Sequence, residues 1–193
     1  LVLLDFLSDE GNSITRYGEK LNKENIAKCE YDFLISFGYR YIICKEILDY
    51  FKGKAINLHI SYLPWNKGAD PNLWSILENT PKGVTIHQMD KKFDSGKILF
   101  QVRTEFGIND TLKSSYEKLE YNVLNLFKEN WRYIKTGVVS PKQQSGEGSY
   151  HNLSDKKTCI LMVDIENTDR KNVQIYKGDT NKKSTLLNKI FKS

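Results

Sequence analysis

The chain has 193 residues, 39% of them hydrophobic and 27% charged, a composition typical of a soluble globular protein with one domain of ordinary size. The net charge of +5 comes from lysines spread along the chain rather than from a clustered basic face, so it does not indicate a nucleic-acid partner. No apolar run is long enough to predict a membrane span, and no secretory signal pattern is present.

The first third of the chain alternates predicted strands and helices. A helix is predicted over 1–7, a short strand over 14–17, and a strand over 31–37 whose near-continuous apolar run predicts burial on both faces of a sheet. A helix over 45–51 and a strand over 55–61 follow. This order predicts a parallel sheet with right-handed crossovers, and therefore an α/β fold.

The middle of the chain continues with a short helix over 72–78 and strands over 83–89 and 97–106. Asp110 and Thr111 offer a cap for a long helix that reaches about Ile134. Apolar residues recur in it at intervals of three and four, which predicts one wide buried stripe. They are Leu112, Tyr116, Leu119, Val123, Leu126, Phe127, Trp131 and Ile134.

The composition changes after Gly137. Residues 140–149 are rich in Pro, Gln, Gly and Ser and predict a linker, and two further strands are predicted over 159–164 and 173–176. We therefore divide the chain into a main domain over 1–139 and a linker with a small β-containing extension over 140–193. A doubly wound domain normally opens on a strand, whereas this chain opens in a helix and without a methionine, so we expect a first strand to precede Leu1 in the natural protein.

The three cysteines, Cys29, Cys44 and Cys159, are widely spaced and lack metal-ligand spacing. They predict free thiols in a reducing compartment, and hence a cytoplasmic protein. As side chains we expect them to be small buried hydrophobic residues.

A polar face ends the strand predicted over 55–61. Asn57, His59 and Ser61 alternate with apolar residues, which is the period of an extended segment with one chemical face and one core face. Pro64 ends the strand and Gly68 allows a turn. Ligands bind at such strand ends in open parallel sheets.

Two sequence blocks together identify a family. The first is Asn57-x-His59-x-Ser61-x-Leu63-Pro64 with Gly68, and the second is Gly83-Val84-Thr85-Ile86-His87 followed by Asp94-Ser95-Gly96. In this order and at these intervals they resemble the formyltransferases that use N10-formyltetrahydrofolate. That family includes the glycinamide ribonucleotide and methionyl-tRNA formyltransferases and the nucleotide-sugar N-formyltransferases. The resemblance is firm over 34–99, and it implies a Rossmann-like parallel-sheet formyltransferase domain.

The resemblance implies that Asn57, His59 and Asp94 are the catalytic residues. When an amine attacks a formyl carbonyl, His59 can take the proton that the amine loses, since a histidine titrates near neutral pH. Asn57 can donate an N–H to the developing oxyanion, and Asp94 can orient the imidazole, stabilise its charged form or hold a water. This chemistry needs no metal, and no spacing in the chain predicts one.

Taken singly, these residues have plainer interpretations. Asn57 could cap a strand end, His59 could be a hydrogen-bonded core histidine, and Asp94 before Ser-Gly is a natural turn former. The ordered set favours the catalytic interpretation. We expect His87 to support its neighbours rather than to react.

The resemblance also implies a pocket for the folate. Backbone groups and apolar side chains before the Asn57 block would hold one side of the flat pterin ring, and the loop before Asp94 would close the other. An ordinary loop with core isoleucines is the alternative. The matching positions are Arg40, Tyr41, Ile42 and Ile43 on one side and Asp90, Lys91, Lys92 and Phe93 on the other.

The acceptor is predicted from the stretch after the catalytic strand, which looks more like that of nucleotide-sugar formyltransferases than that of the purine enzyme. Tryptophan can stack on a pyranose ring, and amides can bind its hydroxyls. Trp74 in the same stretch serves equally well as a packing residue. The predicted substrate-binding residues are Trp65, Asn66, Lys67, Asn72, Tyr150 and His151.

Methionyl-tRNA formyltransferases carry a C-terminal barrel domain with a basic RNA surface, and too few residues follow Pro141 for one. We therefore expect transfer of a formyl group to the amine of a nucleotide-linked amino-dideoxysugar, carried on dTDP, for the lipopolysaccharide O-antigen. The predicted partners are this sugar and the folate, without nucleic acid or membrane, and the extension could complete the sugar pocket or a homodimer contact. The alternatives are a glycinamide ribonucleotide formyltransferase, a formyltetrahydrofolate hydrolase, and a folate- or nucleotide-binding protein without turnover.

Overall fold

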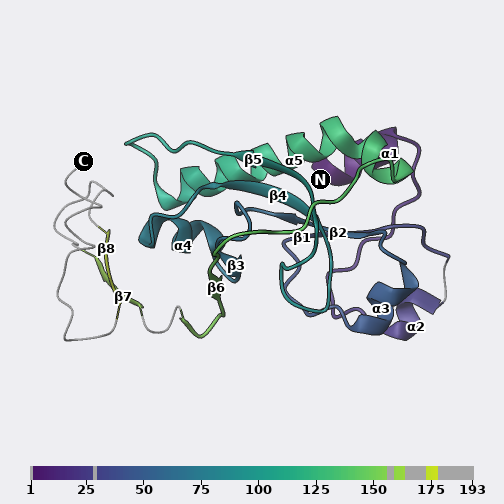
Figure 1. Ribbon diagram of the computed structural model, residues 1–193, viewed down its shortest axis with the longest axis horizontal. Helices are drawn as coiled ribbons and strands as arrows, with labels where there is room; N and C mark the ends of the chain where they lie inside the picture. The colour runs from purple at the N-terminus through teal and green to yellow at the C-terminus, as the bar shows by residue number, and fades with distance from the viewer. Residues whose placement is uncertain (1, 28–29, 156–158, 164–172, 178–193) are drawn as a thin grey trace.

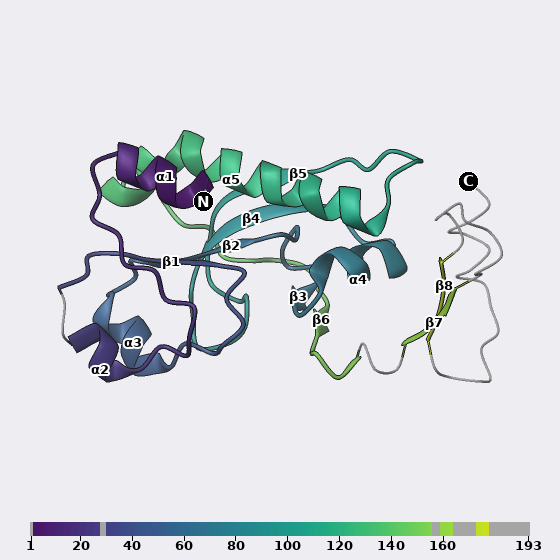
Figure 2. The same cartoon turned by 180° about the vertical axis from the view of Figure 1, so that it is seen from behind.

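The computed structural model describes residues 2–27, 30–155, 159–163 and 173–177. A four-stranded sheet lies between two helical layers, with α1 and α5 on one face and α2 and α3 towards the other (Figures 1 and 2). The elements in chain order are α1 (Val2–Asp9), α2 (Lys23–Ala27), β1 (Leu34–Phe37), α3 (Lys45–Tyr50), β2 (Ala55–His59), β3 (Lys67–Gly68), α4 (Pro71–Leu77), β4 (Gly83–Gln88), β5 (Ile98–Arg103), α5 (Leu112–Thr136), β6 (Tyr150–His151), β7 (Cys159–Val163) and β8 (Val173–Lys177).

The sheet has the order β1-β2-β4-β5 and is mixed. The α/β class is confirmed, but the predicted parallel pairing extends only to β1 and β2, because β2–β4 and β4–β5 are antiparallel. The helix between β2 and β4 does not cross the sheet. Instead α4 packs against α5, so the chain re-enters the sheet from the end at which β2 leaves it. This return brings the two sequence blocks side by side.

The structure corrects two of the predictions made for strands in the first third of the chain. The run over 31–37 was expected to be buried on both faces, yet within Leu34–Phe37 only Ser36 is buried, because β1 lies at the edge of the described sheet. The strand predicted over 14–17 is wrong, since this stretch has no regular secondary structure. Tyr17 instead packs edge-on against Tyr31, and their hydroxyls lie 2.8 Å apart.

The long helix α5 is confirmed, and its ends follow from local chemistry. The Thr111 hydroxyl accepts from the Ser114 N–H while the Thr111 N–H donates to the Ser114 hydroxyl, and Gly137 ends the helix at a φ of 71°. The stripe Leu119, Val123, Phe127, Trp131 and Ile134 is buried against the sheet. Leu112 and Tyr116 are exposed, because the small polar Ser115 occupies the buried position at this end, where its hydroxyl accepts from the Asn72 amide.

The C-terminal strands are also confirmed as an antiparallel pair, β7 and β8. Residues 140–149 contain no helix and no strand, as predicted, apart from an isolated bridge between Lys142 and Ile98. The division of the chain at residue 139 stays a prediction. No helix in the described part of the chain is both long and apolar enough to cross a bilayer.

Cys44 is a free thiol, but it is exposed at the N-cap of α3. The prediction of a buried side chain is therefore wrong for this residue, because a cap position projects from the start of a helix rather than into the core. Cys29 and the side chain of Cys159 lie outside the described residues.

Candidate active site

The antiparallel register of β2 and β4 assembles the site. It sets Asn57 opposite His87, and His59 opposite Thr85. After β4 the chain turns back tightly through Asp94, which has a φ of 47°. A Cβ on Gly96 would lie 1.8 Å from the Gln88 carbonyl oxygen, so only glycine lets the turn approach this closely.

Four side chains meet here, and we call Asn57, His59, His87 and Asp94 the polar cluster. The Asn57 amide donates to Asp94 Oδ1 at 3.2 Å and lies 3.4 Å from His87 Nε2. Asp94 Oδ2 accepts from the Gly68 N–H at 2.8 Å and lies 3.7 Å from His59 Nε2. The structure thus brings the three predicted catalytic residues together and adds His87, which lies 3.4 Å from Asp94 Oδ1.

His59 is buried with one ring nitrogen committed. Its Nε2 lies 3.2 Å from the Asn66 carbonyl oxygen, which can only accept, so the bond requires a hydrogen on Nε2 and leaves Nδ1 to take a proton. Burial lowers the pKa of His59, and the Asp94 carboxylate only partly offsets this. The ring is therefore neutral at neutral pH, which is the form that a general base needs.

Asp94 remains ionised despite its burial. Burial by itself would raise its pKa, but His59, His87 and the Gly68 N–H outweigh it and hold the pKa of this carboxyl well below its usual range. A permanent carboxylate beside His59 can stabilise an imidazolium. The second N–H of the Asn57 amide lies by His87 Nε2 at 3.4 Å, a long contact that it can exchange for a bond to a developing oxyanion.

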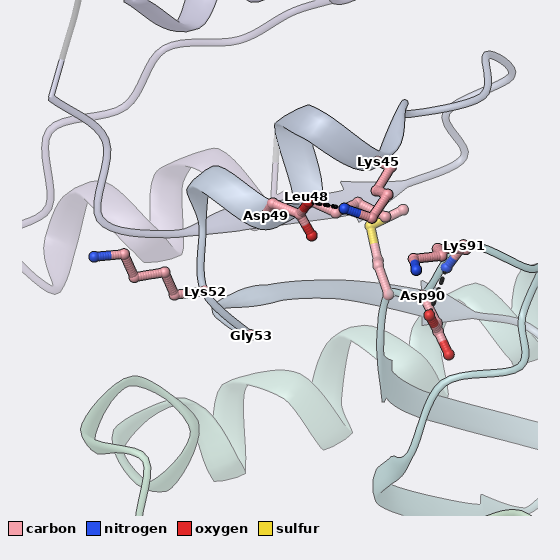
Figure 3. A pocket seen from close by; sticks show the side chains of 8 residues that line it. Lys45, Leu48, Asp49, Lys52, Gly53, Asp90 and Lys91 are labelled. Carbon is pink, nitrogen blue, oxygen red and sulfur yellow. Dashed lines mark hydrogen bonds and ion pairs between the residues drawn. The ribbon is translucent and has the colours of Figure 1, made fainter.

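A pocket of about 240 Å³ lies between α3 and the loop after β4 (Figure 3). It is smaller than the roughly 300–1,000 Å³ of sites for drug-sized ligands, so it suits part of a ligand rather than a whole folate. Apolar Leu48 and Met89 can contact a flat ring, and lysines can bind carboxylates. The lining residues are Lys45, Leu48, Asp49, Lys52, Gly53, Met89, Asp90 and Lys91.

Only part of the predicted folate set lines this pocket. Asp90 and Lys91 line it, whereas Tyr41 and Ile42 are solvent-exposed and lie outside its lining. Arg40, Ile43 and Lys92 do not line it either, and their contact with a folate stays a prediction. The sequence analysis did not predict that α3 side chains such as Lys45, Leu48 and Asp49 line a pocket. Their position directly after the predicted 40–43 segment could have indicated it.

Three of the predicted substrate residues are buried, and their contact with a substrate stays a prediction. Asn66 is fully buried and its amide donates to the Thr80 hydroxyl at 2.7 Å, and the buried Asn72 amide donates to the Leu112 carbonyl and the Ser115 hydroxyl. These hydrogen bonds hold both amide nitrogens within the fold.

His151 is the third buried residue. Its ring stacks on the Trp74 indole at a centroid distance of 3.9 Å, and its Nε2 lies 3.1 Å from a Glu78 carboxylate oxygen. The ring, which belongs to β6, is thus buried against α4. Trp65 and Lys67 are half-buried and Tyr150 is exposed, which leaves these three of the predicted substrate residues open to a ligand.

The tight turn at Gly96 leads to a stability prediction. Gly96→Ala places a Cβ against the Gln88 carbonyl, so the backbone carrying Asp94 must shift, and we expect the free energy of unfolding to fall by about 1–3 kcal/mol. Urea unfolding measures this change. Gly18→Ala is the matched control, because a Cβ there meets nothing within 4 Å and the backbone needs no positive φ. Equal stability of the two variants would contradict the prediction.

In the described residues, no group of three or more His, Cys, Asp or Glu side chains is arranged to hold a metal ion. The polar cluster provides a neutral base, a fixed carboxylate and an amide donor, a set that suits acid–base chemistry.

Several formyltransferases are similar to this chain. The formyltransferase PseJ from Anoxybacillus kamchatkensis, solved with UDP-4,6-dideoxy-4-formamido-L-AltNAc and tetrahydrofolate, is 50% identical, with a TM-score of 0.77 over 80% of this chain and 82% of that one. An N-formyltransferase from Helicobacter canadensis, in complex with folinic acid and dTDP-3-aminofucose, is 28% identical, with a TM-score of 0.63 over 70% of this chain and 50% of that one.

A methionyl-tRNA formyltransferase of Thermodesulfovibrio yellowstonii is 34% identical over 137 residues, which are 68% of this chain. The chain spans only 44% of that curated relative. The sequence profile of the formyl transferase family matches residues 7–129, well over half of the chain. The matched residues contain both sequence blocks and the polar cluster that they form. Because the profile covers most of the chain, the chain belongs to the formyl transferase family.

Proposed function

We propose that this protein transfers a formyl group from N10-formyltetrahydrofolate to the amine of a nucleotide-linked amino sugar. The observation that carries the proposal is the contact of Asn57, His59 and Asp94 at the end of β2, with a buried and neutral imidazole. Leu48 and Met89, the two apolar side chains of the pocket beside α3, can contact a flat ring, and its lysines can bind the carboxylates of a folate.

Each residue of the set has one role. When bound, the folate supplies the formyl group. His59 accepts at Nδ1 the proton that the attacking amine loses as the new C–N bond forms, and later returns it to the departing folate nitrogen. Asn57 donates an N–H to the negative charge that builds on the formyl oxygen. Asp94 and the Asn66 carbonyl hold the Nε2–H of the resulting imidazolium.

The acceptor follows from the relatives and from the open side chains near the cluster. The 50% identical relative was solved with a UDP-linked 4-formamido sugar, so a UDP-linked 4-amino-4,6-dideoxysugar is the first candidate, ahead of the dTDP-linked sugars expected from the sequence. Lys67 can pair with the diphosphate, and Trp65 and Tyr150 can contact rings.

A panel assay tests the acceptor. Purified protein is incubated with N10-formyltetrahydrofolate and UDP-, dTDP- and GDP-linked amino sugars, and we expect a mass gain of one formyl group, fastest on the UDP-linked 4-amino sugar. The same sugar with a hydroxyl in place of the amine is the control. Formylation of glycinamide ribonucleotide alone, or release of free formate alone, would replace this proposal by one of the alternatives.

We also propose that the enzyme works in the cytoplasm as a homodimer and supplies formylated sugars for the lipopolysaccharide O-antigen. The exposed free thiol of Cys44 suits a reducing compartment. In the described part of the chain, β7 and β8 pair only with each other, so their outer edges are open to a second copy. Sedimentation equilibrium distinguishes a dimer from a monomer.

A further inference from the structure

A segment that the sequence predicts as a linker runs against the polar cluster. We call residues 142–151 the strap; Figure 1 shows it in green between the end of α5 and strand β6. Lys142 exchanges two backbone hydrogen bonds of 2.8 Å with Ile98 at one end of the strap. At the other end β6 pairs with β3, which contains Gly68, the residue whose N–H binds Asp94. Both ends are therefore fixed by backbone pairing.

The first strap side chain to reach the cluster's backbone is Gln144. Its Nε2 donates to the Asp94 carbonyl at 2.7 Å and to the Gly96 carbonyl at 2.8 Å. Both partners can only accept, so the orientation of the amide is determined. Asp94 has a positive φ that non-glycine residues rarely adopt, and such a conformation persists only where the surroundings hold it. Gln144 supplies that hold from 50 residues further along the chain.

The second is Ser149. Its hydroxyl accepts from the Asn66 N–H at 2.9 Å and donates to Asn66 Oδ1 at 3.2 Å. Asn66 also has a positive φ, and its carbonyl oxygen is the acceptor for His59 Nε2. Through Asn66, Ser149 therefore determines where the imidazole is held and which of its nitrogens carries the hydrogen.

We propose that Gln144 and Ser149 are positioning residues for formyl transfer: from the strap they hold Asp94 and His59 in the geometry that proton transfer requires. Neither side chain contacts a reacting group directly, because Gln144 binds the Asp94 and Gly96 carbonyls and Ser149 binds Asn66. The inference rests on the proposed function, since it assigns His59 and Asp94 their roles. Its consequence is a loss in kcat without a matching rise in KM.

The strap contains its own matched controls. Gln143 and Ser145 are exposed neighbours of the same residue types as Gln144 and Ser149. Gln144→Glu and Ser149→Ala are compared with Gln143→Glu and Ser145→Ala, so each pair changes the same atoms in the same segment. Glutamate keeps the size of Gln144 but at neutral pH has no hydrogen to donate to the two carbonyls.

We expect Gln144→Glu and Ser149→Ala to lower kcat about 10- to 100-fold, with KM for both substrates within about threefold of wild type. The two controls should retain wild-type kcat. A rise in KM with unchanged kcat, or equal kcat in a variant and its control, would overturn the proposal.

A spectroscopic measurement tests positioning without turnover, and so separates it from the proposed function. The chain has only three histidines, so imidazole ¹⁵N signals can be assigned by single substitutions. We expect the His59 and His87 signals to move in Gln144→Glu, and the His59 signals in Ser149→Ala, but none to move in the controls. Unchanged signals in both test variants would overturn the proposal even if the enzyme proves to be a formyltransferase. Moved signals in a protein inactive on every acceptor would reject the proposed function alone.

Discussion

His59→Ala is expected to lower kcat for formyl transfer by about 10²- to 10⁴-fold, the range that a positioned general base contributes. The buried ring is neutral and its Nε2 is committed to the Asn66 carbonyl, which leaves its Nδ1 as the proton acceptor. Stopped-time assays on the best acceptor of the panel measure kcat. Affinity for tetrahydrofolate, measured by titration, is the control and should remain within about threefold. Retention of more than a tenth of wild-type kcat would contradict the role of His59.

The pH dependence of the wild-type enzyme checks the same role. Protonation removes the base, so kcat falls as the pH falls through the pKa of His59. Because burial lowers that pKa, the acid limb of the profile should lie below pH 6.5, the ordinary value for histidine. An acid limb at or above this value would contradict a buried, neutral base.

Asp94→Asn is expected to lower kcat by about 10²- to 10⁴-fold, as loss of the carboxylate does in hydrolytic triads. The amide has nearly the same size but cannot stabilise an imidazolium by charge. Since Asp94 raises the pKa of His59, the acid limb of the residual activity should also move to lower pH. Asp9→Asn, at the exposed end of α1, is the matched control. An unchanged acid limb, even with lower kcat, would show that Asp94 acts other than through His59.

Local pattern was sufficient where the determining interactions are local. The period-two alternation of Asn57 and His59 with apolar residues predicted β2, and the three- and four-residue spacing with a Thr111 cap predicted α5. The strand predicted over 14–17 failed because an extended segment becomes a strand only where a neighbour pairs with it. The burial expected for β1 failed for a related reason, since an edge position is a property of the whole sheet.

Residue type was a weaker guide to the substrate side of the site. Asn66, Asn72 and His151 were expected to bind the sugar because amides and imidazoles commonly do. In the structure each is buried with partners from distant parts of the chain, such as Ser149 for Asn66 and Glu78 for His151. A polar side chain that binds sugar and one that satisfies the core look alike in sequence, because only burial separates them.

The sequence by itself indicated the family. Asn57, His59 and Asp94 stand in two short blocks whose order and intervals are legible without a structure, and the family they indicate is the one to which the chain belongs. Only the tertiary structure decided that β4 returns antiparallel to β2, that α3 lines the pocket, and that the strap holds the cluster. The bonds from Gln144 to Asp94 and from Ser149 to Asn66 join residues 50 and 83 positions apart. Contacts at such separations leave no local pattern, because they form only after the sheet, the turn and the strap have packed together.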